Sequence, residues 1–173
     1  MRPRVPGTRL RLGIGRICLL LTCCHALAAS AEPVGVGSSI PPIVLEDQHG
    51  ATRGVDATTR AVFLSRDMDG GAFVREALAE DGAAKLEKVG AVYIADVHRM
   101  PGPIRRWIAI PRMRDRSYPV LLDTDGEATA SLPSAEGKAT WIRLEGLRVV
   151  EVRQLGTTAE VVALLGGEAP PGE

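Results

Sequence analysis

The residues best placed to do chemistry lie in the loop after the apolar run Ala61–Ser65. Arg66, Asp67 and Asp69 occupy this loop, and a helical pattern that begins with Phe73 and Val74 follows Gly70 and Gly71. The start of a helix exposes unpaired backbone N–H groups, which can hold an anion. Two aspartates argue against phosphate, and Asp69 is placed to cap the helix. We treat the three side chains as candidate ligand-binding residues, with helix capping as the favoured alternative.

A second candidate site is an arginine-rich segment that ends at Arg116. It contains one acid, Asp115, and six arginines: Arg99, Arg105, Arg106, Arg112, Arg114 and Arg116. Four apolar residues could share one helical face: Ile104, Trp107, Ile108 and Pro111. One interpretation is a solvated helix whose aliphatic side packs on the sheet. The other is a surface that contacts an acidic partner, a phosphate-bearing ligand or an anionic membrane, with Arg105, Arg106 and Arg112 as contact residues.

Metal-binding patterns are incomplete. Asp67-x-Asp69-Gly70 and Asp123-x-Asp125-Gly126 resemble pieces of calcium loops, but neither continues to a carboxylate at the twelfth position. Beyond residue 31 the histidines are His49 and His98, too few for a zinc or copper site by themselves. No glycine-rich nucleotide loop follows a strand there either. The sequence therefore predicts no metal and no cofactor.

The first 31 residues have the pattern of a secretory signal peptide. Several arginines precede the apolar run Ile17–Ala28, which is shorter than a bilayer span, and Ala29-Ser30-Ala31 is a small-x-small cleavage site. We expect cleavage after Ala31 and a periplasmic or secreted protein. A membrane anchor and a lipoprotein that uses Cys23 or Cys24 are weaker alternatives.

Cleavage would change the chemistry available to the chain. All three cysteines, Cys18, Cys23 and Cys24, would leave with the signal peptide, so no disulfide or thiol chemistry would remain. Residues 32–173 hold 16 Lys and Arg against 21 Asp and Glu, a net charge of −5. An exported acidic protein without a broad basic face is not expected to bind nucleic acid.

The order of the expected elements suggests one α/β domain. The segment 32–42 should be a flexible lead-in, residues 43–166 the domain and residues 167–173 a disordered tail. Within the domain we expect a hairpin around Asp47–Gly50 and parallel strands over 61–65 and 91–97, joined by helices ending at Gly90. A short strand near Tyr118, a hairpin turning at Glu145-Gly146 and a helix capped by Thr157 or Thr158 complete the order.

This order resembles the thioredoxin-like superfamily, and within it the peroxiredoxin-like or redoxin branch. Three stretches carry the resemblance: Ile43–Gly50, Ala61–Ala77 and Tyr118–Leu132, the last similar to the branch's F-P-x-L-x-D-x-x-G-x-x-A pattern. The resemblance implies a thioredoxin-like fold, a central mixed β-sheet flanked by helices with an N-terminal hairpin extension.

The chain departs from the branch where its activity would lie. No cysteine occupies the region from Asp67 to Gly70. The junction Gly137–Thr140, just before Trp141, contains no proline, although these folds usually place a cis-proline there. Thiol oxidoreductase and peroxidase activities are therefore not expected, and no catalytic residue can be transferred.

Two functions remain open. The first is an exported, thiol-free thioredoxin-like binding or accessory module whose partner is a protein or a small-molecule ligand, with weak contact to an anionic membrane surface as a further option. The alternative is a cofactor-dependent protein, with flavin or metal, linked to oxidoreductase chemistry through the sheet edge at Arg66, Asp67, Asp69 and Asp96.

Overall fold

The computed structural model describes residues 34–167, so the predicted signal peptide and the tail from Glu168 lie outside the described residues. The strands are β1 (Ile43–Asp47), β2 (Thr52–Val55), β3 (Ala61–Ser65), β4 (Ala91–Asp96), β5 (Leu121–Asp123), β6 (Ala139–Glu145) and β7 (Arg148–Leu155). The helices are α1 (Met68–Ala77), α2 (Gly82–Val89), α3 (Gly102–Ile104), η1 (Arg105–Ala109), α4 (Ile110–Arg114) and α5 (Thr158–Gly166).

The strands form one mixed sheet in the order β2-β1-β5-β4-β3-β6-β7. β3 is buried along its whole length and pairs in parallel with β4, which pairs in parallel with β5. The other pairings are antiparallel. Parallel neighbours need a crossover connection, and α1 and α2 supply it between β3 and β4. The predicted mixed sheet and N-terminal hairpin are therefore confirmed.

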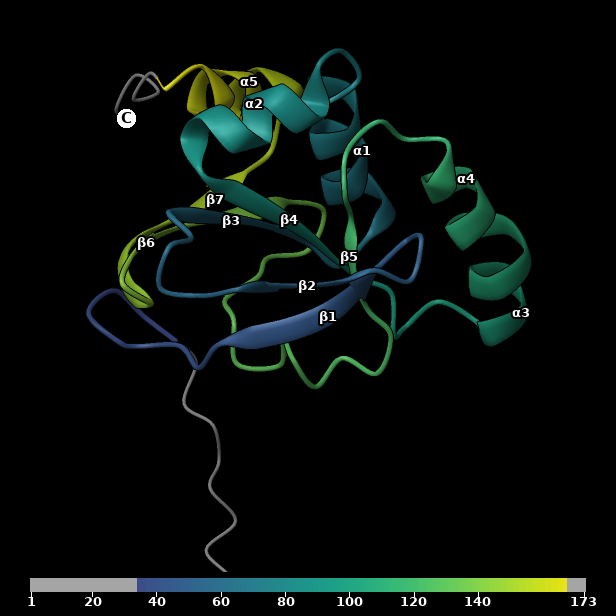
Figure 1. The fold of residues 1–173 in the computed structure, drawn as a ribbon, viewed down its shortest axis with the longest axis horizontal. Helices are drawn as coiled ribbons and strands as arrows, with labels where there is room; N and C mark the ends of the chain where they lie inside the picture. The colour runs from purple at the N-terminus through teal and green to yellow at the C-terminus, as the bar shows by residue number, and fades with distance from the viewer. Residues whose placement is uncertain (1–33, 168–173) are drawn as a thin grey trace, which may run out of the picture. The chain divides into compact units, whose positions relative to one another are not determined.

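Helices cover one face of the sheet. α1, α2 and α5 lie together over that face in Figure 1. Phe63 and Trp141 from the sheet pack there in one apolar cluster with Val74, Leu86 and Val161 from the three helices. Phe63, Val74 and Val161 have no exposed surface, so this cluster is the main core.

The opposite face is covered by loops and by the chain before β1 (Figure 1). A second apolar cluster there includes Ile40, Ile94 and Leu132. The sequence suggests a flexible lead-in before Ile43, yet Val34 N–H donates to Ser131 O and Ile40 N–H to Leu147 O. The described part of the lead-in is therefore tied to the domain by backbone hydrogen bonds.

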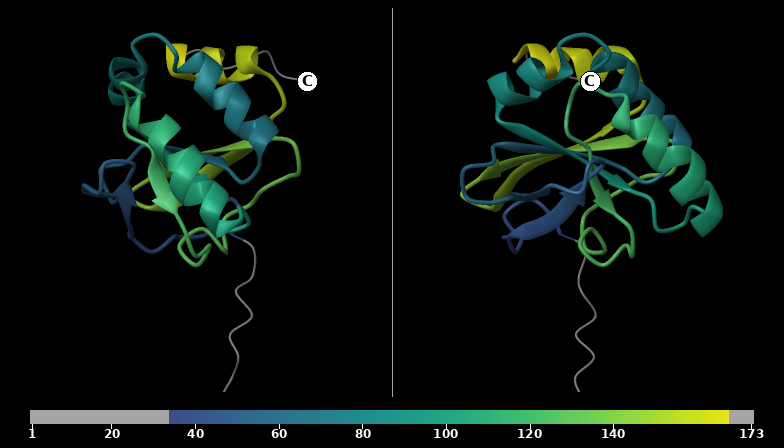
Figure 2. Two further views of the ribbon diagram at one scale, coloured as in Figure 1. Left: turned by 90° about the vertical axis from the view of Figure 1, so that its right-hand side faces the viewer. Right: turned by 45° about the vertical axis from the view of Figure 1, so that its right-hand side comes forward.

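The arginine-rich segment is helical and stands at the side of the domain. Figure 2 shows α3, η1 and α4 as one continuous helical rod beside the sheet. The middle of the rod is a π-helix, in which Ile110 N–H donates to Arg105 O. Pro111 follows immediately; it has no N–H, and its ring would collide with the carbonyl four residues earlier in a regular α-helix. The wider π-turn accommodates this proline.

Candidate functional site

A single carboxylate joins the loop after β3 to the loop before β6, and in this sense we call the loop after β3 closed. Asp67 is the N-cap of α1, and its Oδ1 accepts from Gly70 N–H at 2.8 Å. Its Oδ2 accepts from Gly137 N–H at 2.8 Å, in the loop before β6. The aspartate thus joins the start of α1 to a segment 70 residues away in the sequence.

The close approach of these two segments requires a glycine. A Cβ on Gly70 would lie 2.4 Å from Lys138 O, a distance that non-bonded atoms do not reach. Asp67, rather than the predicted Asp69, caps the helix. The helix begins at Met68, so Asp69 lies exposed inside its first turn.

We expect Asp67→Ala to lower the free energy of unfolding by about 2 kcal/mol, because it removes the cap and leaves Gly137 N–H without its acceptor. Urea denaturation at neutral pH measures the change. Asp69→Ala is the matched control in the same turn, with an expected loss of about 0.5 kcal/mol. Equal losses in the two variants would contradict the assigned cap.

A buried polar network lies next to this loop, where the parallel strands β3, β4 and β5 end. Arg66 donates from Nη1 to Asp96 Oδ2 at 2.9 Å, and from Nη2 to the carbonyls of Thr129 and Leu132. The Asp96 side chain is only 1% exposed and that of Arg66 16%. The other oxygen of Asp96 lies 2.6 Å from His98 Nδ1. The ion pair with Asp96 holds the Arg66 guanidinium inside the domain.

A second aspartate extends the network. Asp123 is fully buried and accepts through Oδ1 from Gly126 N–H and through Oδ2 from the N–H and hydroxyl of Thr129. Thr129 Oγ1 also lies 3.2 Å from Asp96 Oδ2, which links the two carboxylates. In the sequence, Asp123-x-Asp125-Gly126 resembles a piece of a calcium loop, and no local pattern indicates the contacts of Thr129.

Two tyrosines lie on the other side of the loop. Tyr93 is buried, and its hydroxyl lies 2.8 Å from Ser65 Oγ. Burial raises the pKa of the Tyr93 phenol and that of the Tyr118 phenol. Both hydroxyls are therefore protonated at neutral pH, and neither is poised as a base.

The predicted contact arginines lie elsewhere. Arg106 and Arg112 are exposed on the helical rod, while Arg105 is half-buried and donates to Thr124 O at 2.9 Å. The loop after β3 therefore holds Arg66 and Asp67, the first turn of α1 holds Asp69, and the rod holds Arg105, Arg106 and Arg112. Among residues 34–167, no hydrogen bond or ion pair joins the first three residues to the other three.

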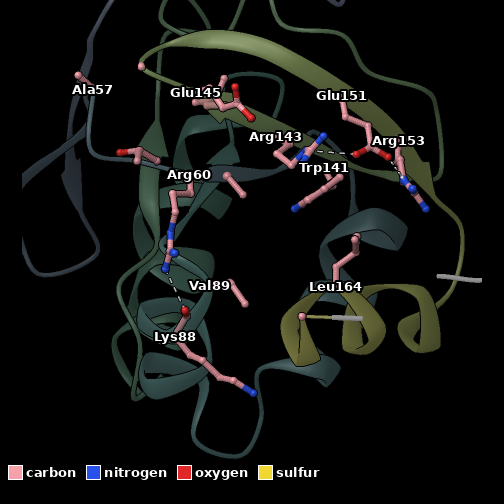
Figure 3. A pocket seen from close by; sticks show the side chains of 15 residues that line it. Ala57, Arg60, Lys88, Val89, Trp141, Arg143, Glu145, Glu151, Arg153 and Leu164 are labelled. Atoms are coloured by element: carbon pink, nitrogen blue, oxygen red, sulfur yellow. Dashed lines mark hydrogen bonds and ion pairs between the residues drawn. The ribbon is translucent and has the colours of Figure 1, made fainter. Parts of the chain in front are cut away.

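A cavity of about 600 Å³ lies at the opposite end of β3, between the sheet and helices α2 and α5. Figure 3 shows Arg60, Val89, Trp141 and Leu164 around it. Glu151 lies 3.3 Å from the Arg143 guanidinium and 2.5 Å from that of Arg153, so it neutralises part of the positive rim. No candidate site residue lines this cavity.

The described residues hold no group of three His, Cys, Asp or Glu side chains that could bind a metal ion. None of the helices between residues 34 and 167 is long and apolar enough to cross a membrane. In the two aspartate motifs, Asp67 accepts from Gly70 and Gly137 N–H, and Asp123 accepts from Gly126 N–H.

Comparisons with known proteins identify the fold. No family model matches the chain, and no curated protein matches it. A peroxidoxin, BcpB from Mycobacterium tuberculosis, superposes with a TM-score of 0.50 at 20% identity over 78% of this chain and 97% of its own.

Two further solved structures agree. A putative protein disulfide isomerase from Bacteroides thetaiotaomicron gives a TM-score of 0.51 at 17% identity, covering 78% of this chain and 87% of its own. A putative thiol:disulfide interchange protein DsbE from Chlorobium tepidum gives 0.51 at 14% identity, covering 78% and 94%. The sheet order, the helix placement and these superpositions show that the chain has a thioredoxin-like fold.

Proposed function

We propose that this chain is an exported thioredoxin-like protein that acts by binding, through the helical rod, and not by thiol chemistry. The observation that carries the proposal is the closed loop after β3. Asp67 uses both carboxylate oxygens on backbone N–H groups, and Gly70 lies against the backbone of Lys138. The described residues contain no cysteine. The loop thus offers a rigid support rather than a nucleophile.

Export rests on the signal-peptide pattern of residues 1–31. The exported form would consist of residues 32–173, with a net charge of −5 and no thiol. A periplasmic or secreted setting is oxidising, and a protein without cysteine neither gains nor loses a disulfide there.

The alternative, a flavin or metal site at the same sheet edge, gains no support from the contacts. Arg66 is held by Asp96 and two carbonyls, and Asp67 by Gly70 and Gly137. A ligand there would have to displace these internal partners. The arginines of the rod, by contrast, form no ion pair with a carboxylate among residues 34–167.

The test is capture from an envelope extract that contains both periplasmic proteins and membrane fragments. We expect immobilised residues 32–173 to retain a partner and the variant R105E/R106E/R112E to lose at least about tenfold of it, because three attractive charges become repulsive. R75E/K88E/R148E changes three exposed residues by the same total charge and should retain the partner. Equal retention by both triple variants would overturn the proposal.

A further inference from the structure

The outward face of the helical rod is apolar, which the sequence did not settle. Trp107 is 71% exposed, Ile104 46% and Ile108 45%. With the exposed Pro111 they keep the i, i+3, i+4, i+7 spacing predicted from the sequence, and all four side chains are exposed although the π-helix over Arg105–Ala109 has a longer period than an α-helix. Three large exposed apolar side chains on adjacent turns form a patch rather than isolated surface residues.

This patch belongs to a helix that is already anchored to the domain. Ile110 and Met113 point the other way and pack against the main core. Arg114 Nε donates to Gln48 O at 3.0 Å, and Arg105 Nη1 to Thr124 O at 2.9 Å. The patch is therefore a second apolar face that the fold of residues 34–167 leaves uncovered.

The segment that carries the patch is rich in positive charge. Six of the sixteen basic residues between positions 34 and 167 lie from Arg99 to Arg116, with Asp115 as the single acid among them. Arg105 and Arg114 donate to carbonyls of the domain and Arg116 lies over the Tyr118 ring, so Arg106 and Arg112 are the exposed arginines of the rod that remain beside the patch. The guanidinium of Arg106 lies 5.3 Å from the centre of the Trp107 ring, a cation–π distance. A tryptophan flanked by aliphatic side chains and arginines matches the boundary between lipid headgroups and acyl chains, where the indole sits at headgroup level.

The size of the patch also favours a membrane over a protein partner that would contact the rod alone. The rod has thirteen residues, from Gly102 to Arg114, and is about 20 Å long. A standard protein interface uses about 20–30 residues on each side. An anionic leaflet needs only a few inserted apolar side chains together with several cations near its surface.

We infer that the helical rod docks on an anionic phospholipid surface, with Ile104, Trp107 and Ile108 inserted and Arg106 and Arg112 at the headgroup phosphates. This inference rests on the proposed binding function and names its partner. The rod would lie in the plane of the leaflet, and the thioredoxin-like domain would stay in the aqueous phase.

The experiment is co-sedimentation of residues 32–173 with vesicles, because residues 1–31 would themselves bind lipid. We expect binding to phosphatidylcholine vesicles that contain about 30% phosphatidylglycerol, little binding to pure phosphatidylcholine, and release in about 0.5 M salt. R106E/R112E and Trp107→Ala should each weaken binding at least about tenfold, whereas R75E/R148E, which changes two exposed residues by the same total charge, should stay within about twofold. Because Trp141 is only 9% exposed, a blue shift of tryptophan emission on binding would report Trp107.

Two results would overturn the inference: no preference for anionic vesicles, or equal losses of binding in R106E/R112E and R75E/R148E. If vesicles fail to bind while the envelope extract still yields a partner through the arginines, the partner is a protein. In that case the lipid inference is wrong and the proposed binding function stands.

Discussion

Asp96→Ala should lower the free energy of unfolding by about 3–5 kcal/mol, the largest single effect we expect. The substitution leaves the largely buried guanidinium of Arg66 without its carboxylate and removes the acceptor of His98 Nδ1. A buried charge that loses its partner destabilises the folded state far more than the loss of an exposed ion pair does. Urea denaturation of residues 32–173 at neutral pH measures the loss.

Two further variants make this prediction specific. Asp96→Asn keeps the shape and some hydrogen bonds and should lose less than Asp96→Ala. Asp115→Ala removes an exposed carboxylate and should change stability by no more than about 0.5 kcal/mol. If Asp96→Ala lowered the free energy of unfolding as little as Asp115→Ala, the burial of Arg66 would not require its ion pair with Asp96.

Gly70→Ala and Gly71→Ala should have opposite effects on stability although they are neighbours in α1. A Cβ at Gly70 would lie 2.4 Å from Lys138 O, so the helix and the loop before β6 must separate, at a cost of about 3 kcal/mol. A Cβ at Gly71 would meet Ser65 Oγ at an ordinary 3.5 Å. Alanine suits a helix better than glycine, so Gly71→Ala should stabilise by about 0.5 kcal/mol.

Thermal or urea unfolding of the two glycine variants checks this contrast. A Gly70→Ala protein as stable as the wild type would mean that α1 and the residues before Ala139 are not in contact. The same result would remove the main support for a closed loop after β3.

Local signals predicted much of this fold. The largely apolar run Ala61–Ser65 indicated a strand, and Gly90 ends its helix, as predicted, with a positive φ that glycine adopts without strain. The turn after Glu145 was also predicted, although Leu147 shares the left-handed backbone with Gly146 there. Each of these features depends on residues close together in the sequence.

The candidate site depends on contacts between distant residues, which no local pattern records. Asp67 meets Gly137, and Asp96 meets both Arg66 and Thr129, only once the sheet has formed. The helical period grouped Ile104, Trp107 and Ile108 correctly but could not tell which face of the rod meets the domain. Ile110 and Met113 form a competing apolar face, and that face is the one that packs.

The most direct test of binding without thiol chemistry is capture of a partner from the envelope extract. Three proteins are compared in parallel: residues 32–173 unchanged, the same chain with Asp67→Ala, and the same chain with R105E/R106E/R112E. Asp67 closes the loop after β3, whereas the three arginines lie on the helical rod. We predict that Asp67→Ala, measured below its unfolding transition, retains the partner within about twofold, while the arginine variant loses at least about tenfold. Loss of the partner by folded Asp67→Ala, with full retention by the arginine variant, would contradict the account.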